Sequence, residues 1–289
     1  MAVSILHSLN EKQQEDIRKL IAVCNEYDEL KRQPDLKEED NYNAELNSYY
    51  CYYEQDNLLS VLIIYQPFEE EAEITAYTLP SYRRQGYFKA LLKAAWKELK
   101  KFGILQIAFV VEYQSKDGKD CAAGLGADIE RSDYLMVYDY NAIREREVIE
   151  NSKEIIVTDL TTDNMKDGIK VFRQIFNWEE EQIEEVMRES LGSPDYHTYL
   201  GYVNGKIAGT LSVYQRVTSV SIFGFGILKR YRGKGYGKCF LNHILSIYKQ
   251  EGKEKVILQV ESERQEAFHL YKKTGFTVLE EYDYYYMDI

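Results

Sequence analysis

The chain has 289 residues, of which 48 are acidic and 36 are basic, giving a formal net charge of -12 at pH 7. This acidic balance argues against a general nucleic-acid binder. Apolar runs such as residues 61–65 have the length of a strand and are too short to span a membrane. A chain of this length is expected to form two domains of ordinary size.

The four cysteines are scattered singly along the chain. None stands in a C-x-x-C pair or in zinc-site spacing, so we expect reduced thiols and no metal. The first residues, MAVSILHSLNEKQQED, carry no basic segment followed by an apolar core, and we therefore expect no secretion signal. These features predict a cytoplasmic protein.

The first half opens with a helical pattern and continues with strands. After the helix, residues 25–47 are polar and acidic, and segments 48–54 and 58–66 then predict a strand pair. Segment 71–79 predicts a third strand, and a glycine turn at 82–87 leads into a second helix. The apolar stripe of the first helix consists of Ile17, Leu20, Ile21 and Cys24. That of the second helix consists of Phe88, Leu91, Ala95 and Leu99.

The second half follows a charged segment without aromatic residues. This segment, 141–152, is interpreted as a linker between a first domain at 1–140 and a second domain at 153–289. In the second domain we expect helices at 165–176 and 179–190. Its strands are predicted at 154–158, 196–203, 206–215, 219–228 and 255–260.

The stretch 219–250 has the composition of an anion site. An apolar strand leads into a glycine turn, and a helix with one apolar face follows the turn. No acidic residue lies between Asp195 and Glu251, whereas basic residues crowd the turn. Glycines at a helix N-terminus let phosphate oxygens approach unpaired backbone N–H groups. The basic residues are Lys229, Arg230, Arg232, Lys234 and Lys238.

Two common phosphate loops do not fit this turn. A P-loop requires four residues between its glycines and a Ser or Thr after its lysine, but here Lys238 is followed by Cys239. The dinucleotide fingerprint fails because Lys229 stands where its third glycine should be. The pattern that does fit is [QR]-x-x-G-x-[GA], with Arg232 and Gly235 at its defined positions and Gly237 at its end.

A second motif follows the next strand. Residues 267–276, AFHLYKKTGF, match the pattern A-x-x-L-Y-x-x-x-G-F. With the glycine turn, this segment resembles the GNAT N-acetyltransferase superfamily. The resemblance implies an acetyl-CoA-dependent N-acetyltransferase, with acetyl-CoA as co-substrate and a small-molecule or peptide amine as acceptor. The residues implied to bind acetyl-CoA are Phe225, Gly226, Ile227, Arg232, Gly233, Lys234, Gly235, Tyr236, Gly237 and Lys238.

The glycine turn is repeated in the first half. Tyr82, Arg83, Gly86, Tyr87 and Lys89 recur with the same spacing in the second turn, and this is an internal repeat. The chain thus resembles a tandem GNAT protein over nearly its whole length. The resemblance implies an α+β fold with two GNAT-like domains. Each would have a mixed, mostly antiparallel central sheet flanked by helices.

The two halves differ at positions that matter for the chemistry. Phe88 replaces the last glycine of the turn, and Ala122 stands where the second half has Tyr271. We therefore expect the first domain to be non-catalytic, either a scaffold or a vestigial CoA site, and the second domain to be catalytic. Tyr271 is the candidate general acid, because a phenol of pKa about 10 is protonated at neutral pH and can donate to a departing thiolate.

The general base is left open. Glu261 follows the strand at 255–260, and Glu179 and Glu180 lie between the first two helices of the second domain. A base is also unnecessary if water relays the proton or the amine arrives neutral. Arg264 stands where many relatives have an asparagine, which puts that contact in doubt.

Alternatives for function and acceptor also remain. The chain could be a non-catalytic acyl-CoA-binding or sensing protein, or both domains could be active. In the family, the acceptor pocket is built by segments that correspond here to 177–193 and 280–289, and their acids would favour a cationic amine. We expect no nucleic-acid or membrane partner, and the sequence leaves monomer and homodimer open.

Overall fold

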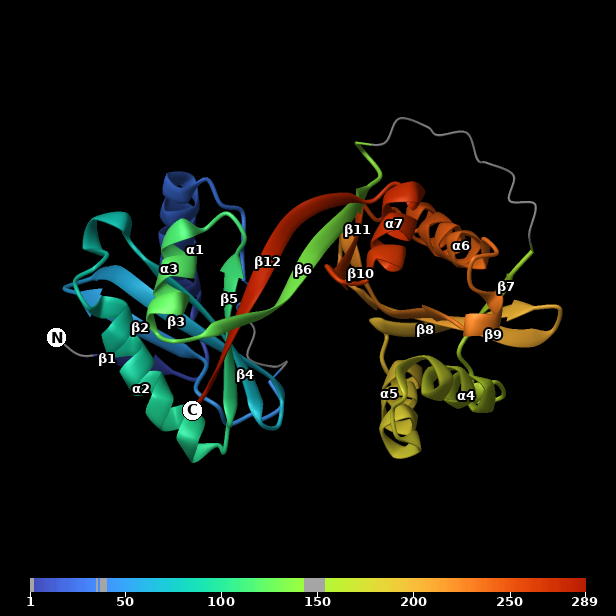
Figure 1. The fold of residues 1–289 in the computed structure, drawn as a ribbon, viewed down its shortest axis with the longest axis horizontal. Helices are drawn as coiled ribbons and strands as arrows, with labels where there is room; N and C mark the ends of the chain where they lie inside the picture. Colours follow the sequence, from blue (N-terminus) through green and yellow to red (C-terminus); the bar gives the residue numbers. More distant parts are fainter. Residues whose placement is uncertain (1–2, 35, 37–40, 143–153) are drawn as a thin grey trace. The chain divides into compact units, whose positions relative to one another are not determined.

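The computed structural model describes residues 3–34, 36, 41–142 and 154–289, and it divides into two compact units (Figure 1). Unit 1 contains the chain up to Asp133 together with Glu280–Ile289, and unit 2 contains Tyr134–Leu279. The linker expected at 141–152 lies almost entirely outside the described residues, and the domain boundaries drawn around it stay predictions. Each unit takes one strand segment from the other half of the sequence.

Unit 1 is built on a mixed sheet. Its strands are β1 (Val3–Leu6), β2 (Tyr49–Glu54), β3 (Asn57–Phe68), β4 (Glu71–Thr78), β5 (Gln106–Glu112), the first part of β6 (Asp128–Asp139) and the last part of β12 (Thr277–Asp288). They follow the order β1-β2-β3-β4-β5-β12-β6. β4 and β5 are parallel, whereas the pairs from β1 to β4 and the pair of β5 with β12 are antiparallel.

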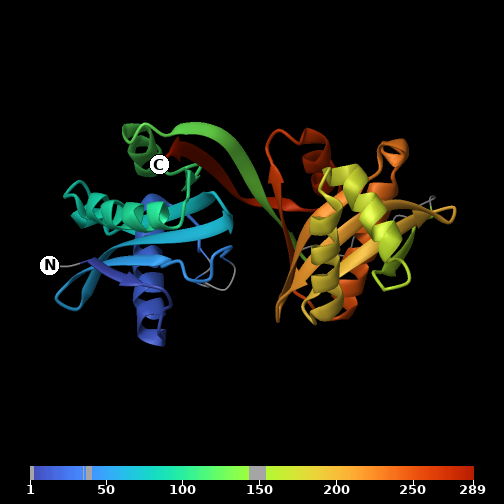
Figure 2. The same ribbon diagram turned by 90° about the horizontal axis from the view of Figure 1, so that it is seen from below.

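Helices cover both faces of this sheet (Figure 2). They are α1 (Glu11–Asp28), α2 (Tyr87–Lys101) and α3 (Lys116–Gly124). The stripe expected on the first helix is confirmed, since Ile17, Leu20, Ile21 and Cys24 are all buried. On the opposite face, α2 buries Leu91, Ala95 and Leu99 in one apolar cluster with residues of β4 and β5. The two stripes face opposite sides of one sheet. The glycine turn before α2 follows the C-terminal end of β4.

Unit 2 has a similar arrangement of strands and helices. Its elements are β7 (Ile156–Asp159), α4 (Met165–Phe176), α5 (Glu180–Gly192), β8 (Tyr196–Val203), β9 (Lys206–Gln215), β10 (Ser219–Ile227), α6 (Tyr236–Gln250), β11 (Lys255–Glu261), α7 (Gln265–Thr274) and the remaining parts of β6 and β12. The strand order is β7-β8-β9-β10-β11-β6-β12, and only the β10–β11 pair is described as parallel. The expected α+β class with mostly antiparallel sheets is confirmed.

In both units the parallel strand pair separates after four residues. β4 pairs with β5 from Glu71 to Ile74, and β10 pairs with β11 from Ser219 to Ile222. Both β4 and β10 continue beyond that point, to Thr78 and Ile227 respectively. The strand ends that lead into the two glycine turns therefore lack a parallel neighbour, and their backbone groups need other partners.

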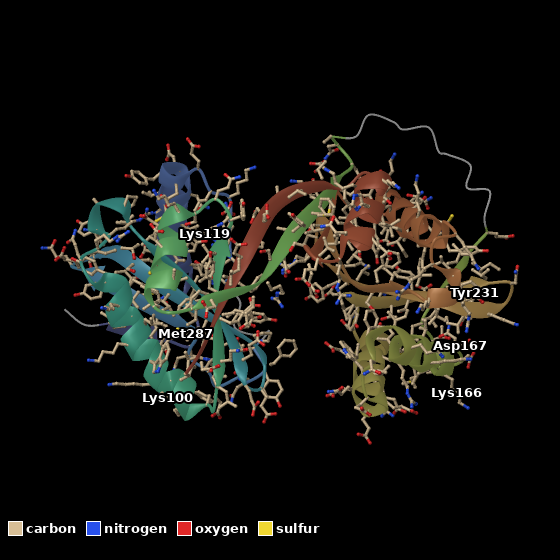
Figure 3. The ribbon with its side chains drawn as sticks, viewed as in Figure 1. Lys100, Lys119, Lys166, Asp167, Tyr231 and Met287 are labelled. Carbon is tan, nitrogen blue, oxygen red and sulfur yellow. The ribbon has the colours of Figure 1, made fainter. Side chains whose placement is uncertain are left out.

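The last strand belongs to unit 1 over most of its length. β12 pairs with β5 from Tyr282 to Asp288. Asp283 is 2% exposed, and it accepts bonds from Lys119 Nζ at 2.8 Å and from Ser132 Oγ at 2.6 Å. Figure 3 labels Lys119 on α3 and Met287 on β12. The contacts of Asp283 thus lie within unit 1. This acid therefore does not support the expectation that acids of segment 280–289 attract a cationic acceptor to unit 2.

This placement predicts that deleting Glu280–Ile289 destabilises the N-terminal unit rather than the C-terminal one. β5 would lose a neighbouring strand and the buried Tyr284 side chain. In hydrogen exchange, peptides covering β5 should lose most of their protection, while peptides covering β9 keep theirs. The variant Asp288→Asn, at an exposed position of the same strand, is the control. Unchanged protection of β5 in the deletion variant would contradict the strand assignment.

Candidate functional site

The glycine turn of unit 2 presents the N-terminus of α6. Gly233 and Gly235 have φ of 70° and 88°, in the left-handed region that favours glycine. Gly235 is the N-cap of α6, and in the described turn no side chain caps the helix. The residues from Arg232 to Gly235 are exposed. The first N–H groups of α6 thus have no described side-chain cap, and the binding of an anion there stays a prediction.

Basic side chains of this turn are fixed by backbone carbonyls. Arg232 Nε donates to the carbonyl of Ile227 at 2.7 Å, and Lys234 Nζ donates to that of Arg230 at 2.8 Å. These contacts neutralise no charge, because their acceptors are uncharged. The turn therefore keeps a concentration of positive charge at the positive end of the helix dipole.

The strand before the turn is irregular where the sequence places two glycines. The register between β10 and β9 shifts between Phe223 and Gly226, and Gly224 has φ of 56°. This is a bulge, and it lies just beyond the point where β10 leaves β11. A Cβ at Gly226 would lie 2.5 Å from Ile175 Cγ2, so close packing explains this glycine. Both interpretations of the glycines, a bulge and a strand opening, apply to this segment.

Tyr271 lies on α7 next to this segment. Its ring centroid is 6.3 Å from that of Phe225 and 5.8 Å from that of Phe276, and the side chain is 7% exposed. Burial raises the pKa of Tyr271 to about 12, with a smaller opposing effect of Arg264. The phenol is thus a proton donor throughout the neutral range. Its role as general acid stays a prediction.

The candidate bases are engaged in local contacts. Glu261, at the end of β11, is 43% exposed and pairs with Arg264 Nε at 2.9 Å. Glu180 pairs with Arg173 at 3.3 Å, and Glu179 forms the capping box at the start of α5. Arg264, which replaces the expected asparagine, thus holds Glu261. The choice among these carboxylates stays open.

Unit 1 has a turn with nearly the same backbone. Arg83 and Arg232 both have φ of -65° and ψ of 158°. Gly86 is the N-cap of α2, with φ of 91°, and Arg84 adopts φ of 60° where unit 2 has Gly233. A left-handed non-glycine residue is strained by roughly 1 kcal/mol. The turn geometry is therefore kept in unit 1 at an energetic cost.

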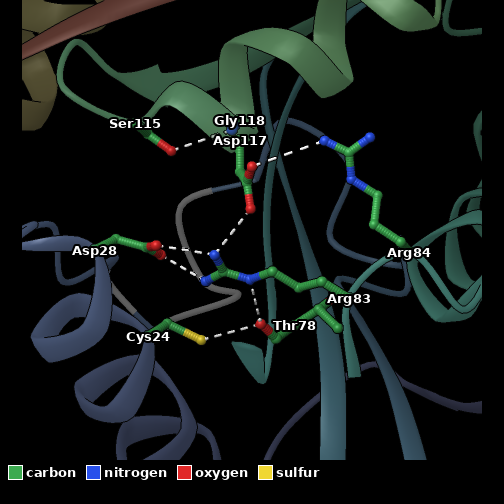
Figure 4. A network of polar contacts seen from close by, with 8 residues as sticks. All are labelled: Cys24, Asp28, Thr78, Arg83, Arg84, Ser115, Asp117 and Gly118. Carbon is green, nitrogen blue, oxygen red and sulfur yellow. Dashed lines mark hydrogen bonds and ion pairs between the residues drawn. The ribbon is translucent and has the colours of Figure 1, made fainter. Parts of the chain in front are cut away.

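The side chains around that turn differ from those of unit 2. Arg83 forms ion pairs with Asp28 and Asp117 (Figure 4). The ring of Phe88, which replaces the last glycine of the turn, lies 6.5 Å from the ring of Phe109. Ala122, at the position of Tyr271, is buried. Unit 1 thus lacks the phenol, and its turn arginine pairs with two acids, whereas no ion pair of Arg232 is described in unit 2.

Unit 1 also contains a cavity of about 600 Å³ between the separated ends of β4 and β5. The sequence analysis missed it. Ala122 lines this cavity, so the small residue that removes the candidate acid also leaves space. The alanine at position 122, in place of the tyrosine of the second half, was the sequence feature that could have indicated this cavity. The polar side chains lining the cavity include Asp28, Arg32, Arg83, Glu112, Ser115 and Asp117.

Comparison with known proteins identifies the family. The model of the acetyltransferase (GNAT) family matches this chain twice, at residues 14–119 and 159–276. The chain belongs to the GNAT family. The two matches confirm the tandem organisation that the repeated turn predicts. No curated protein sequence matches this chain.

Solved structures show the same GNAT fold over the whole chain. A GCN5-related N-acetyltransferase from Sphaerobacter thermophilus has a TM-score of 0.79 at 15% identity, and the match covers 99% of this chain and 95% of that one. A tandem GNAT protein from the clavulanic acid biosynthesis pathway has a TM-score of 0.67 at 11% identity, with 99% and 98% covered. An acetyltransferase of the GNAT family from Colwellia psychrerythraea has a TM-score of 0.65 at 12% identity, with 99% and 100% covered.

Three further observations bear on ligands and location. Among the described residues, no helix combines the length and apolar character needed to cross a bilayer. The same residues contain no group of three or more His, Cys, Asp or Glu that could hold a metal ion. All four cysteines are free thiols.

The raised pKa of Tyr271 predicts a pH-dependent stability difference from the variant Tyr271→Phe. Between pH 10 and about 12 the unfolded phenol ionises while the folded one stays protonated, so wild-type stability falls as pH rises through this window. Urea unfolding at pH 8 and pH 11 should show that wild type loses about 1.4 kcal/mol more than the variant. An equal loss in both proteins would contradict the assignment.

Proposed function

We propose that the chain transfers an acetyl group from acetyl-CoA to a primary amine of a small molecule or peptide, and that unit 2 is the catalytic domain. The observation that carries this proposal is the turn from Arg232 to Lys238. It joins an uncapped helix N-terminus to a basic segment of the chain that contains no acidic residue. This combination suits the diphosphate of CoA.

Acetyl-CoA would supply the thioester, and residues of unit 2 would bind and orient it. Backbone N–H groups of the turn would hold the diphosphate. The segment from Phe225 to Ile227 lies beyond the part of β10 that pairs with β11, so on that side its backbone could bind the pantetheine arm as an added strand. An N–H there would polarise the thioester carbonyl.

The acceptor amine would attack the thioester carbon, and the bond from that carbon to sulfur would break. Tyr271 would donate its proton to the departing thiolate, and solvent would return it. The proton lost by the amine would go to a base. Glu261 could serve once its pair with Arg264 opens, and a neutral amine with a water relay would need no carboxylate.

A second candidate function is activity in both units. The cavity of unit 1 and the shared backbone of the two turns favour it. Ala122 speaks against it, because the candidate acid is absent from unit 1. Non-catalytic binding of acyl-CoA is the remaining alternative.

The isolated free thiols support a cytoplasmic place of action.

The first test is calorimetric titration with acetyl-CoA. Wild type should bind one equivalent, because Arg232 has no described carboxylate partner whereas Arg83 has two. Gly235→Glu should abolish this binding, since it places an acid at the N-cap of α6. Gly86→Glu, at the same position of the unit 1 turn, is the matched control and should leave the site intact. Loss with Gly86→Glu alone would move the site to unit 1.

The second test concerns Tyr271. The variant Tyr271→Phe should lower kcat about a hundredfold or more while acetyl-CoA affinity stays near that of wild type, because only proton donation is removed. Release of the CoA thiol can be followed with a panel of primary amines. Tyr199→Phe, which removes another buried hydroxyl of unit 2, bonded to Tyr248 at 3.0 Å, is the control. An unchanged kcat in Tyr271→Phe would exclude it as the acid.

A further inference from the structure

The arginine of the unit 1 turn is held by two carboxylates that come from different helices (Figure 4). Arg83 NH1 donates to Asp28 Oδ1 at 2.9 Å and to Asp117 Oδ2 at 3.1 Å, and NH2 pairs with the other oxygen of Asp28. Its Nε donates to the carbonyl of Thr78 at 3.2 Å. Asp28 ends α1 and Asp117 lies in the first turn of α3. The guanidinium therefore has little donor capacity left for a ligand.

These pairs lie at the cavity and are partly shielded from water. Arg83 and Asp28 side chains are 19% and 21% exposed, and both line the cavity together with Asp117. Partial burial strengthens a charge pair relative to one on the open surface. The Asp28 pair also engages both carboxylate oxygens, which is the stronger geometry for arginine.

The corresponding arginine of unit 2 has a different environment. Arg232 Nε makes the same bond to the end of the preceding strand, at the carbonyl of Ile227. The last residue of α4 is Phe176, where α1 ends with Asp28. The first turn of α7 does carry an acid, Glu266, at the position of Asp117, but no described contact joins it to Arg232. Among the described contacts of Arg232, none is an ion pair with a carboxylate.

The backbone does not explain a difference between the two turns. The arginine has the same φ and ψ in both, and the N-cap glycines agree to within 3° in φ. A diphosphate at the unit 1 turn would meet the same N–H groups, but it would have to displace Asp28 and Asp117 from Arg83 and lie beside their charges. Any difference in diphosphate binding between the two turns must then come from their side chains.

We propose that Asp28 and Asp117 are specificity residues that exclude the CoA diphosphate from the cavity of unit 1 by occupying Arg83. The proposal rests on the assignment of the CoA site to unit 2. It gives the acids of the first half a definite role: the turn keeps the GNAT backbone, and two carboxylates make it selective against phosphate ligands.

The experiment uses the full chain carrying Gly235→Glu, so that only unit 1 can respond. In this background CoA should show no measurable binding by calorimetry. Adding Asp28→Asn and Asp117→Asn should create a site that binds CoA at least about tenfold tighter than the background. Because the gain requires phosphates, the same variant should bind CoA at least about tenfold tighter than pantetheine, which has none.

The control adds Glu26→Gln and Asp120→Asn to the same background. This pair changes the net charge equally and lies on the same two helices, but neither residue has a described contact with Arg83. It should create no site. Because Asp117 is 51% exposed, Asp117→Asn alone is a mild second variant, and it should give a smaller gain with an unchanged unfolding temperature.

Three outcomes would overturn the proposal. They are CoA binding to unit 1 in the Gly235→Glu background, no gain in the Asn variants, and equal affinities for CoA and pantetheine. The first outcome would also contradict the assignment of the CoA site to unit 2, whereas the other two concern Asp28 and Asp117 alone. Failure of the proposed function by itself would show as no CoA binding to the wild-type protein. The difference in CoA affinity between the Asn variants and their control tests the role of Asp28 and Asp117 whether or not the proposed function holds.

Discussion

The structure depends on the requirement that backbone groups find hydrogen-bond partners where a parallel strand pair separates. β4 and β10 each lose their parallel neighbour after four residues. In both units the arginine of the following turn supplies one missing bond, from Nε to the last carbonyl of the strand, at Thr78 or Ile227. The arginine thus has a structural role in closing the strand end, before any role toward a ligand.

This shared role explains why one backbone can serve two different sites. The Nε bond fixes the arginine in each unit, and the N–H groups at the end of the guanidinium can then contact other partners. In unit 1 they meet Asp28 and Asp117, and in unit 2 no such pair is described. The turn is therefore a common frame, and in unit 1 the carboxylates that occupy its arginine come from helices that are distant in sequence.

Because residues Glu280–Ile289 belong to unit 1, the acids of this segment need a different interpretation from the one their place in the sequence suggests. By its place in the sequence, Asp283 belongs beside the acceptor pocket of the second domain. In the structure, its segment pairs with β5, and the carboxylate is buried between Lys119 and Ser132. Removing either partner would leave this buried carboxylate uncompensated, so Asp283 is committed to unit 1 and is not available to attract a substrate.

The sequence by itself determined the tandem GNAT organisation, the two turns and most elements of unit 2, because glycine spacing and apolar periodicity are local properties. It also singled out Tyr271, through the motif at residues 267–276. Only the tertiary structure decided that residues 280–289 complete unit 1, that Asp28 and Asp117 meet at Arg83, and that Ala122 lines a cavity. Each of these depends on strands or helices far apart in the chain, and no local pattern encodes which distant partner a strand edge or a charged side chain will find.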